Sequence, residues 1–160
     1  MLYAYKVISL INQNGEYGTL INIGFTGGKT GMNQRFIELG PGYSDLYELL
    51  ELAKANQYRM HYFLCLQSEG PSGKVMSFVL VMKKSSYGDF IPLYICREGM
   101  PVLDNKPSKR FELFEQAAKD QNREIISMEV RHSSTFADPD LYYQYLIGIL
   151  RMNRFLPPLQ

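Results

Sequence analysis

Polar and ionisable side chains are grouped at the ends of two predicted strands and on one predicted helix. Arg97 and Glu98 end one strand, whereas Glu129 and Arg131 occupy one face of another strand that ends at His132. If the fold places these residues together, they form a patch with both charge signs, which can bind a polar ligand or transfer a proton. A structural ion-pair patch is the simpler interpretation, so we assign no catalytic residue. The candidate binding residues are Arg97, Glu98, Glu129, Arg131, His132, Tyr142 and Tyr143.

Metal binding and covalent chemistry have little support in the sequence. The two histidines, His61 and His132, are far apart, and no cysteine–histidine spacing typical of zinc is present, so we predict no metal site. Cys65 and Cys96 lie in apolar runs, as reduced buried thiols do, and the N-terminal segment does not have the pattern of a secretory signal. The sequence therefore predicts a cytoplasmic protein without a cofactor.

The glycine-rich segment Gly24–Thr30, GFTGGKT, has the composition of a loop that holds nucleotide phosphates. Such a loop places four residues between its first glycine and its Gly-Lys pair, whereas this segment has three. Gly40–Gly42 also limits any helix begun at Met32 to about eight residues, which makes a weak anion-binding dipole. We predict an ordinary loop, with a non-standard nucleotide site at Gly27–Thr30 as an alternative.

Length and composition indicate a single globular domain over residues 1–160. Hydrophobic residues make up 46% of the chain and charged residues 21%, which is typical of a folded protein with its own core. The net charge is +1, and the basic residues are scattered, with Lys83–Lys84 and Lys106–Arg110 as the main groupings. Because no strong field gathers polyanions, we predict neither a nucleic-acid partner nor a membrane partner.

Strand patterns and turns predict an α+β fold on a mainly antiparallel sheet of about six strands. Both alternating sets of residues are largely apolar in the central strands, so both faces of the sheet should be covered. Pro92 places the third central strand at an edge. The expected strands are an N-terminal hairpin (Leu2–Ile11 and Thr19–Phe25), a three-stranded meander (Tyr58–Gln67, Val75–Lys84 and Phe90–Arg97) and a last strand (Ile125–His132).

Three helices are predicted to pack on this sheet, each with a recognisable start. Ser44 begins the first, Pro107–Ser108 the second, and Asp138–Pro139 the third, where the proline needs no amide partner. Their expected inner faces are Leu46, Leu49, Leu50 and Ala53; then Phe111, Phe114 and Ala118; then Tyr142, Tyr145, Leu146, Ile149 and Met152.

From Met60 onward, the order of three antiparallel strands, helix, strand and helix resembles the core of the GNAT acetyltransferase superfamily. The stretch Lys109–Val130, KRFELFEQAAKDQNREIISMEV, is similar in pattern to that superfamily's pyrophosphate-side helix and following strand. The resemblance implies acyl transfer from acetyl-coenzyme A, with Tyr142 or Tyr143 as general acid and Glu98 or Glu129 as base. Family members carry a glycine-rich loop before this helix, where Lys106–Arg110 has no glycine.

The leading interpretation is a non-enzymatic, oligomeric binding module with a pocket between its sheet and helices, because this function requires no missing motif. Twelve tyrosines, some crowded on the last helix, are compatible with a subunit interface, and we expect a homodimer that takes a small-molecule or protein ligand. The alternatives are a divergent GNAT-like acyltransferase that uses acetyl-coenzyme A and a non-standard nucleotide binder.

Overall fold

The computed structural model describes residues 33–39, 44–84, 86, 90–103 and 106–158. The expected N-terminal hairpin and the glycine-rich segment Gly24–Thr30 lie outside the described residues. The elements are β1 (Asn33–Glu38), α1 (Ser44–Ala55), the short 3-10 helix η1 (Gln57–Arg59), β2 (Met60–Gly70), β3 (Gly73–Met82), β4 (Phe90–Pro101), α2 (Lys109–Asp120), β5 (Ile125–Glu129), the 3-10 helix η2 (Ser133–Thr135) and α3 (Pro139–Met152).

The described strands form a five-stranded mixed sheet in the order β1-β4-β3-β2-β5. The central meander β2-β3-β4 is antiparallel, as expected, but β1 pairs in parallel with β4 and β5 pairs in parallel with β2. The expected α+β class is confirmed, but the sheet of the described residues is mixed and five-stranded rather than mainly antiparallel with about six strands. The cause is the helical connections β1-α1-β2 and β4-α2-β5, since a helix returns the chain to the start of the sheet and the next strand then runs parallel.

Strand β1 lies where the sequence suggested at most a short helix. Its pairing with β4, from Asn33 opposite Phe90 to Glu38 opposite Ile95, stabilises the extended conformation of a short polar segment. This pairing also moves β4 to the sheet interior, so the edge position expected from Pro92 is wrong. The β3–β4 register pairs run no further than Val81 with Leu93, and Pro92 pairs with Arg35 of β1 instead, so the missing amide interrupts no β3–β4 bond.

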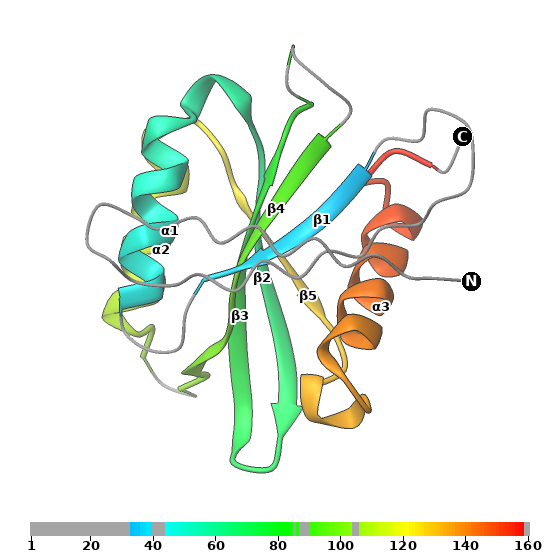
Figure 1. Ribbon diagram of the computed structural model, residues 1–160. Coiled ribbons are helices and arrows are strands. Elements are labelled where there is room, and N and C mark those ends of the chain that lie inside the picture. The colour runs from blue at the N-terminus through cyan, green and yellow to red at the C-terminus, as the bar shows by residue number, and fades with distance from the viewer. Residues whose placement is uncertain (1–32, 40–43, 85, 87–89, 104–105, 159–160) are drawn as a thin grey trace, which may run out of the picture.

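Helices cover both faces of the sheet, which confirms the expectation drawn from the doubly apolar strands. In Figure 1, α1 and α2 lie together on one side of the sheet and α3 lies alone on the other. Alternate residues of β2 show the division, since Phe63 and Cys65 face α1 and α2, whereas Leu64 and Leu66 face α3. The described part of the chain is thus an α/β/α arrangement of three layers.

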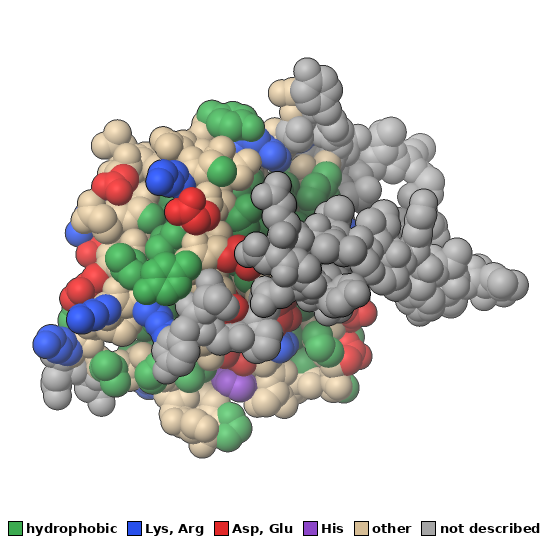
Figure 2. All heavy atoms as spheres, turned by 60° about the vertical axis from the view of Figure 1, so that its left-hand side comes forward, with side chains coloured by type: hydrophobic (Ala, Val, Ile, Leu, Met, Phe, Trp, Pro, Cys, Tyr) green, Lys and Arg blue, Asp and Glu red, His purple; other side chains and the backbone are tan. Residues whose placement is uncertain are grey.

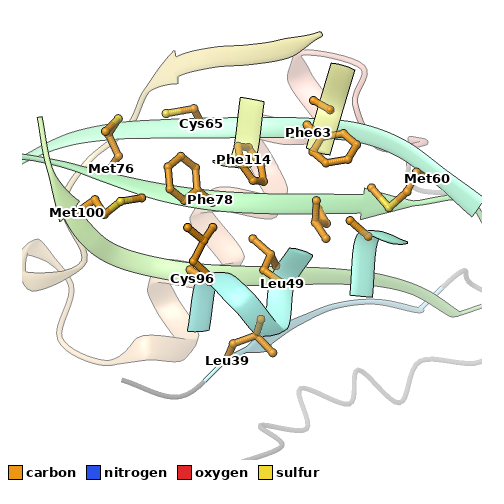
Figure 3. Packing of buried hydrophobic residues seen from close by; sticks show 14 of the residues in the cluster. Leu39, Leu49, Met60, Phe63, Cys65, Met76, Phe78, Cys96, Met100 and Phe114 are labelled. Atoms are coloured by element: carbon orange, nitrogen blue, oxygen red, sulfur yellow. The ribbon is translucent and has the colours of Figure 1, made fainter. Parts of the chain in front are cut away.

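The core on the α1/α2 side is centred on aromatic rings. Phe114 of α2 is fully buried, and its ring centroid lies 4.4 Å from that of Phe78 and 5.4 Å from that of Phe63. Figure 3 shows these rings between the strands and the helices, with Leu49 of α1 and the two cysteines nearby. This packing fixes both crossover helices on the sheet.

The predicted helix starts are confirmed where their caps are described. Ser108 Oγ accepts a hydrogen bond from Phe111 N, and Asp138 Oδ1 accepts one from Leu141 N, with Pro139 in the first turn of α3. The inner face of α3 is rotated from the expected one: Met152 is 77% exposed, and the buried residues are Tyr142, Tyr143, Leu146 and Leu150.

None of the helices in the described part of the chain combines the length and apolar character that a membrane span requires.

Candidate functional site

Polar side chains meet where the parallel strands end, beneath the first turns of α3. Glu38 is the last residue of β1, Glu98 lies near the end of β4, and His132 and Ser133 follow β5. Because β1, β4 and β5 run in the same direction, their carboxyl ends lie at one edge of the sheet, where α/β proteins often place functional groups. We call these groups the strand-end cluster; its members are Glu38, Arg97, Glu98, His132, Ser133 and Tyr143.

Glu98 is the centre of this cluster. Its carboxylate accepts hydrogen bonds from Ser133 N and Ser133 Oγ, both at 2.6 Å, and lies 3.2 Å from His132 Nε2. Its backbone N–H donates to Ser77 Oγ of β3 at 2.7 Å. Glu98 has a φ of 48°, a left-handed conformation that costs a residue with a side chain about 1 kcal/mol or more. The carboxylate therefore ties β4 to the segment that leads into α3, and strained backbone holds it there.

The protonation pattern of His132 follows from its neighbours. Ser134 N donates to His132 Nδ1 at 3.1 Å, so Nδ1 is an acceptor and Nε2 carries the proton that faces Glu98. Ser134 Oγ lies 2.8 Å from the same Nδ1, which gives Ser134, His132 and Glu98 the connectivity of a nucleophile, a base and an orienting carboxylate. However, the serine's own N–H occupies the nitrogen that would take its proton, and this geometry is that of a cap on η2.

A second carboxylate, Glu38, links β1 to α3 and β4. Tyr143 OH donates to Glu38 Oε2, and Arg97 Nε lies 3.1 Å from Glu38 Oε1. Burial, together with this hydrogen bond to a carboxylate, raises the pKa of Tyr143, so its hydroxyl stays protonated at neutral pH. Tyr142 is also fully buried, and burial followed by the charge of Glu98 raises its pKa. These tyrosines are hydrogen-bond donors rather than bases.

Gly70 provides a test of how tightly the cluster is packed. A Cβ at this position would lie 2.5 Å from both Cδ2 and Nε2 of His132, and the ring is held by Glu98 on one side and Ser134 on the other. We expect Gly70→Ala to lower the free energy of unfolding by about 1–3 kcal/mol, measured by urea denaturation.

Two matched variants interpret that measurement. Gly99→Ala, with nothing within 4 Å of its added carbon, should change stability by less than about 0.5 kcal/mol. In a His132→Ala background, Gly70→Ala should cost much less than in the native chain, because the clash is gone. An equal cost in both backgrounds would show that the ring is not the obstacle.

The structure brings together some of the residues selected from the sequence. Arg97, Glu98, His132 and Tyr143 belong to the strand-end cluster, and the buried Tyr142 precedes Tyr143 on α3. Glu129 is exposed on β5 opposite Gln67, and the exposed Arg131 contributes only its backbone N–H, which donates to Tyr145 OH. Neither Glu129 nor Arg131 places its side chain in the cluster.

The two thiols belong to the hydrophobic core on the α1/α2 side of the sheet. Cys65 and Cys96 are free and buried, and burial raises the pKa of Cys65 to about 11 and the pKa of Cys96 further. A thiol with a raised pKa is a poor nucleophile at neutral pH. In the described part of the chain, no three His, Cys, Asp or Glu residues come together in a group that could hold a metal ion.

A groove of about 770 Å³ lies at the opposite end of the sheet, between the strands and the C-terminal turn of α3. This volume is typical of a small-molecule site. Its wall includes the ends of β3 and α3 and the segment after α3. The lining residues are His61, Val81, Met82, Lys83, Lys84, Ile91, Arg151, Met152, Arg154, Phe155, Leu156, Pro157 and Pro158.

The charged residues among the described lining residues are Lys83, Lys84, Arg151 and Arg154, all of them cations. Arg151 donates from Nη2 to the neutral Gln34 Oε1, while its buried Nε has no partner among the described residues. Burial lowers the pKa of Arg151, the direction expected where desolvation of the guanidinium is not offset by a carboxylate. The groove therefore contains a cation that a bound anion would stabilise.

Arg154 is a second arginine in the groove wall, and His61 is an uncharged residue beside the cations. Arg154 has a φ of 62° just beyond the end of α3, a position where glycine is favoured, so the chain keeps a charged side chain there at a cost in stability. Burial, with smaller contributions from Lys83 and Arg123, lowers the pKa of His61 and keeps the imidazole neutral at neutral pH. By contrast, Figure 2 shows acidic and basic side chains interspersed on the side of the molecule that carries α1 and α2.

Comparison with known proteins places this geometry in a family. The model of the family described as Domain of unknown function (DUF7147) matches residues 32–156, which is most of the chain. The chain belongs to this family. The DUF7147 match includes the whole strand-end cluster and all but the last two residues of the groove wall. No curated protein and no solved structure matches the chain.

Within the DUF7147 domain, four of the six members of the strand-end cluster had been selected from the sequence, whereas Glu38 and Ser133 had not. A pocket between sheet and helices was expected, but none of the described residues that line the groove was among the candidates. The candidates near the strand ends were selected because polar residues followed predicted strands. The groove residues come from four separate segments, and its cations are divided between Lys83–Lys84 and the end of α3. The available signals were the Lys83–Lys84 pair at the end of a strand and Arg151 with Arg154 at the end of a helix.

Proposed function

We propose that the protein is a binding module without chemistry of its own, and that it takes an anionic small molecule in the groove between α3 and the sheet. The observation that carries this proposal is that the charged residues in the described part of the groove wall are all cations. They include Arg151, which has no carboxylate partner among the described residues. An anion bound there supplies the missing partner in a partly desolvated site, where a charge-assisted hydrogen bond is strong.

Thermal unfolding and calorimetry with a panel of anions test this proposal. The panel contains inorganic phosphate, simple carboxylates, acetyl-coenzyme A, and ATP and GTP with magnesium. An anion at a hundred times its dissociation constant adds about 2.7 kcal/mol of stability. Arg151→Gln should weaken binding about tenfold, whereas Lys74→Gln, an exposed charge loss at the other end of β3, should leave it unchanged. The proposal fails if no anion binds, or if Arg151→Gln and Lys74→Gln bind the anion with equal affinity.

The same panel tests the two alternative functions, which are acyl transfer from acetyl-coenzyme A and nucleotide binding. Acyl transfer resembling the GNAT superfamily would use bare amides at the start of α2, but Ser108 Oγ already accepts from Phe111 N there. Binding of acetyl-coenzyme A that survives Arg151→Gln would favour that alternative. A homodimer remains a separate prediction, which light scattering after size-exclusion chromatography tests directly.

Arg154→Gly separates stability from binding. Glycine adopts the left-handed conformation of residue 154 without strain. We therefore expect the free energy of unfolding of this variant to be about 0.5–1 kcal/mol higher than that of the native chain. The same change removes an exposed cation from the groove, so anion affinity should fall about twofold to fivefold. Urea denaturation and calorimetry give the two quantities.

Asn122→Gly is the control for this variant. Asn122 also has a positive φ, of 52°, directly after α2, but it does not line the groove, and asparagine tolerates this conformation. It should change stability less than Arg154→Gly and leave anion affinity unaltered. Loss of affinity in Asn122→Gly, or no loss in Arg154→Gly, would contradict a role of Arg154 in the groove.

A further inference from the structure

The side chains of the groove fall into two chemical classes. Apart from the neutral imidazole of His61, one class is apolar: Val81, Met82, Ile91, Met152, Phe155, Leu156, Pro157 and Pro158; the other is basic: Lys83, Lys84, Arg151 and Arg154. Among the lining residues that the structure describes, there is no Ser, Thr, Asn, Gln, Asp, Glu or Tyr side chain. Sites that recognise sugars or nucleobases use several such neutral hydrogen-bonding groups to fix orientation. Of the described lining side chains, only the neutral imidazole of His61 is of this kind.

The floor of the groove is the open end of the hydrophobic core on the α3 side. Val81, Ile91 and Leu156 are buried core residues, yet they also line the groove. Water makes no hydrogen bonds to such a floor. An apolar group that replaces the water is stabilised in proportion to the apolar area that it covers. Met152, which is 77% exposed at the rim, has a flexible side chain that can pack against an apolar group of variable shape.

Basic groups lie beside this apolar floor rather than replacing it. Arg151 is partly buried and is held by Gln34, and Lys83 and Arg154 are exposed beside it. A single carboxylate or phosphate can contact these cations while the rest of a molecule covers the floor. We propose that the ligand of the groove is a free anionic amphiphile, one carboxylate or phosphate group joined to an apolar body; this inference rests on the proposed function.

The charge of the chain distinguishes a free amphiphile from a membrane surface. The same head and tail chemistry occurs in anionic lipids, but stable attachment to a bilayer requires several basic groups on one surface or an inserted apolar element. The net charge of this chain is only +1, so the chain as a whole has no excess of basic groups that would hold it on an anionic bilayer. The groove therefore favours a single dissolved molecule.

The test is isothermal titration of the full chain with methyl, butyl and octyl phosphate, each below its critical micelle concentration. We expect affinity to rise about fourfold for each added methylene that enters the groove, so octyl phosphate should bind at least tenfold more tightly than methyl phosphate. AMP should bind no better than methyl phosphate. Arg151→Gln should weaken the binding of octyl phosphate about tenfold. Met152→Gln, at an exposed position that tolerates the change, should reduce the gain in affinity for each added methylene.

The other outcomes separate this inference from the proposed function. Arg151-dependent binding of phosphates without a chain-length effect would overturn the amphiphile and leave the anion-binding function standing. No binding of any phosphate would overturn both. Octyl glucoside that binds as tightly as octyl phosphate would show that the anionic head is not recognised. Attachment to phosphatidylglycerol vesicles without binding of free octyl phosphate would assign the groove to a membrane surface and overturn the inference.

Discussion

Replacing Glu98 with alanine should lower the free energy of unfolding by about 2–4 kcal/mol, which corresponds to a fall in the melting temperature of roughly 6–12 °C at this chain length. The carboxylate accepts hydrogen bonds from the N–H and Oγ–H of Ser133 and faces His132 Nε2, and its side chain is only 12% exposed. Alanine leaves these part-buried donors without an acceptor. It also stays in the left-handed conformation of residue 98, so no strain is relieved.

Two further variants separate the charge of Glu98 from its shape. Glu98→Gln keeps an acceptor for Ser133 N but loses the charge. Its free energy of unfolding should therefore lie between those of the native chain and of Glu98→Ala. Glu129→Ala, which removes an exposed carboxylate from β5, should change stability by less than about 0.5 kcal/mol. Equal effects of Glu98→Ala and Glu129→Ala in urea denaturation would show that the strand-end cluster does not anchor the segment leading into α3.

Replacing Phe114 with alanine should have the largest effect of any single truncation considered, about 3–5 kcal/mol of unfolding free energy. The ring is fully buried and stacks on Phe78, with Phe63 beside it, so its loss leaves a cavity between α2 and the sheet (Figure 3). Because α1 and α2 pack on the same face, partial collapse of this cavity would disturb both helices. Chemical denaturation followed by circular dichroism gives the magnitude.

A neighbouring leucine provides the control for this truncation. Leu113, on the same helix, is 40% exposed, and Leu113→Ala removes apolar atoms of α2 without opening a core cavity, so it should cost less than about 1 kcal/mol. If Phe114→Ala unfolds the chain outright, Phe114→Leu provides a milder measurement, because it keeps most of the volume. A small effect of Phe114→Leu and Phe114→Ala alike would mean that α2 is not fixed by this ring.

Features encoded by neighbouring residues could be predicted from the sequence. Ser108 and Asp138 cap helices because their side chains reach amides three residues away, and the meander follows from strand periodicity and short connections. Strand β1 could not be predicted, because its short polar segment is extended only through its pairing with β4. The inner face of α3 was misjudged for the same reason, since contact with the sheet decides which of several apolar stripes is buried.

The candidate site shows the same division. Glu98 and His132 were selected as polar residues at strand ends, but their contact depends on β5 pairing with β2 and on the chain then crossing to α3. No periodicity in the sequence indicates that crossing. The lining residues of the groove could not be predicted from the sequence. Its cations resemble ordinary surface residues, and only the fold places the end of α3 beside the end of β3.

The mixed direction of the strands also determines how the sheet can assemble. Pairs within the meander are close in the chain, as in Gly70 with Gly73, whereas the parallel pairs join distant segments, as in Asn33 with Phe90 and Phe63 with Ile125. Closing such long loops loses chain entropy before any contact compensates, so the meander forms first and the outer strands are added later. The amides of β1 and β5 should therefore exchange with solvent before those of β3, and the strand-end cluster, which depends on both outer strands, is among the last parts of the molecule to become ordered.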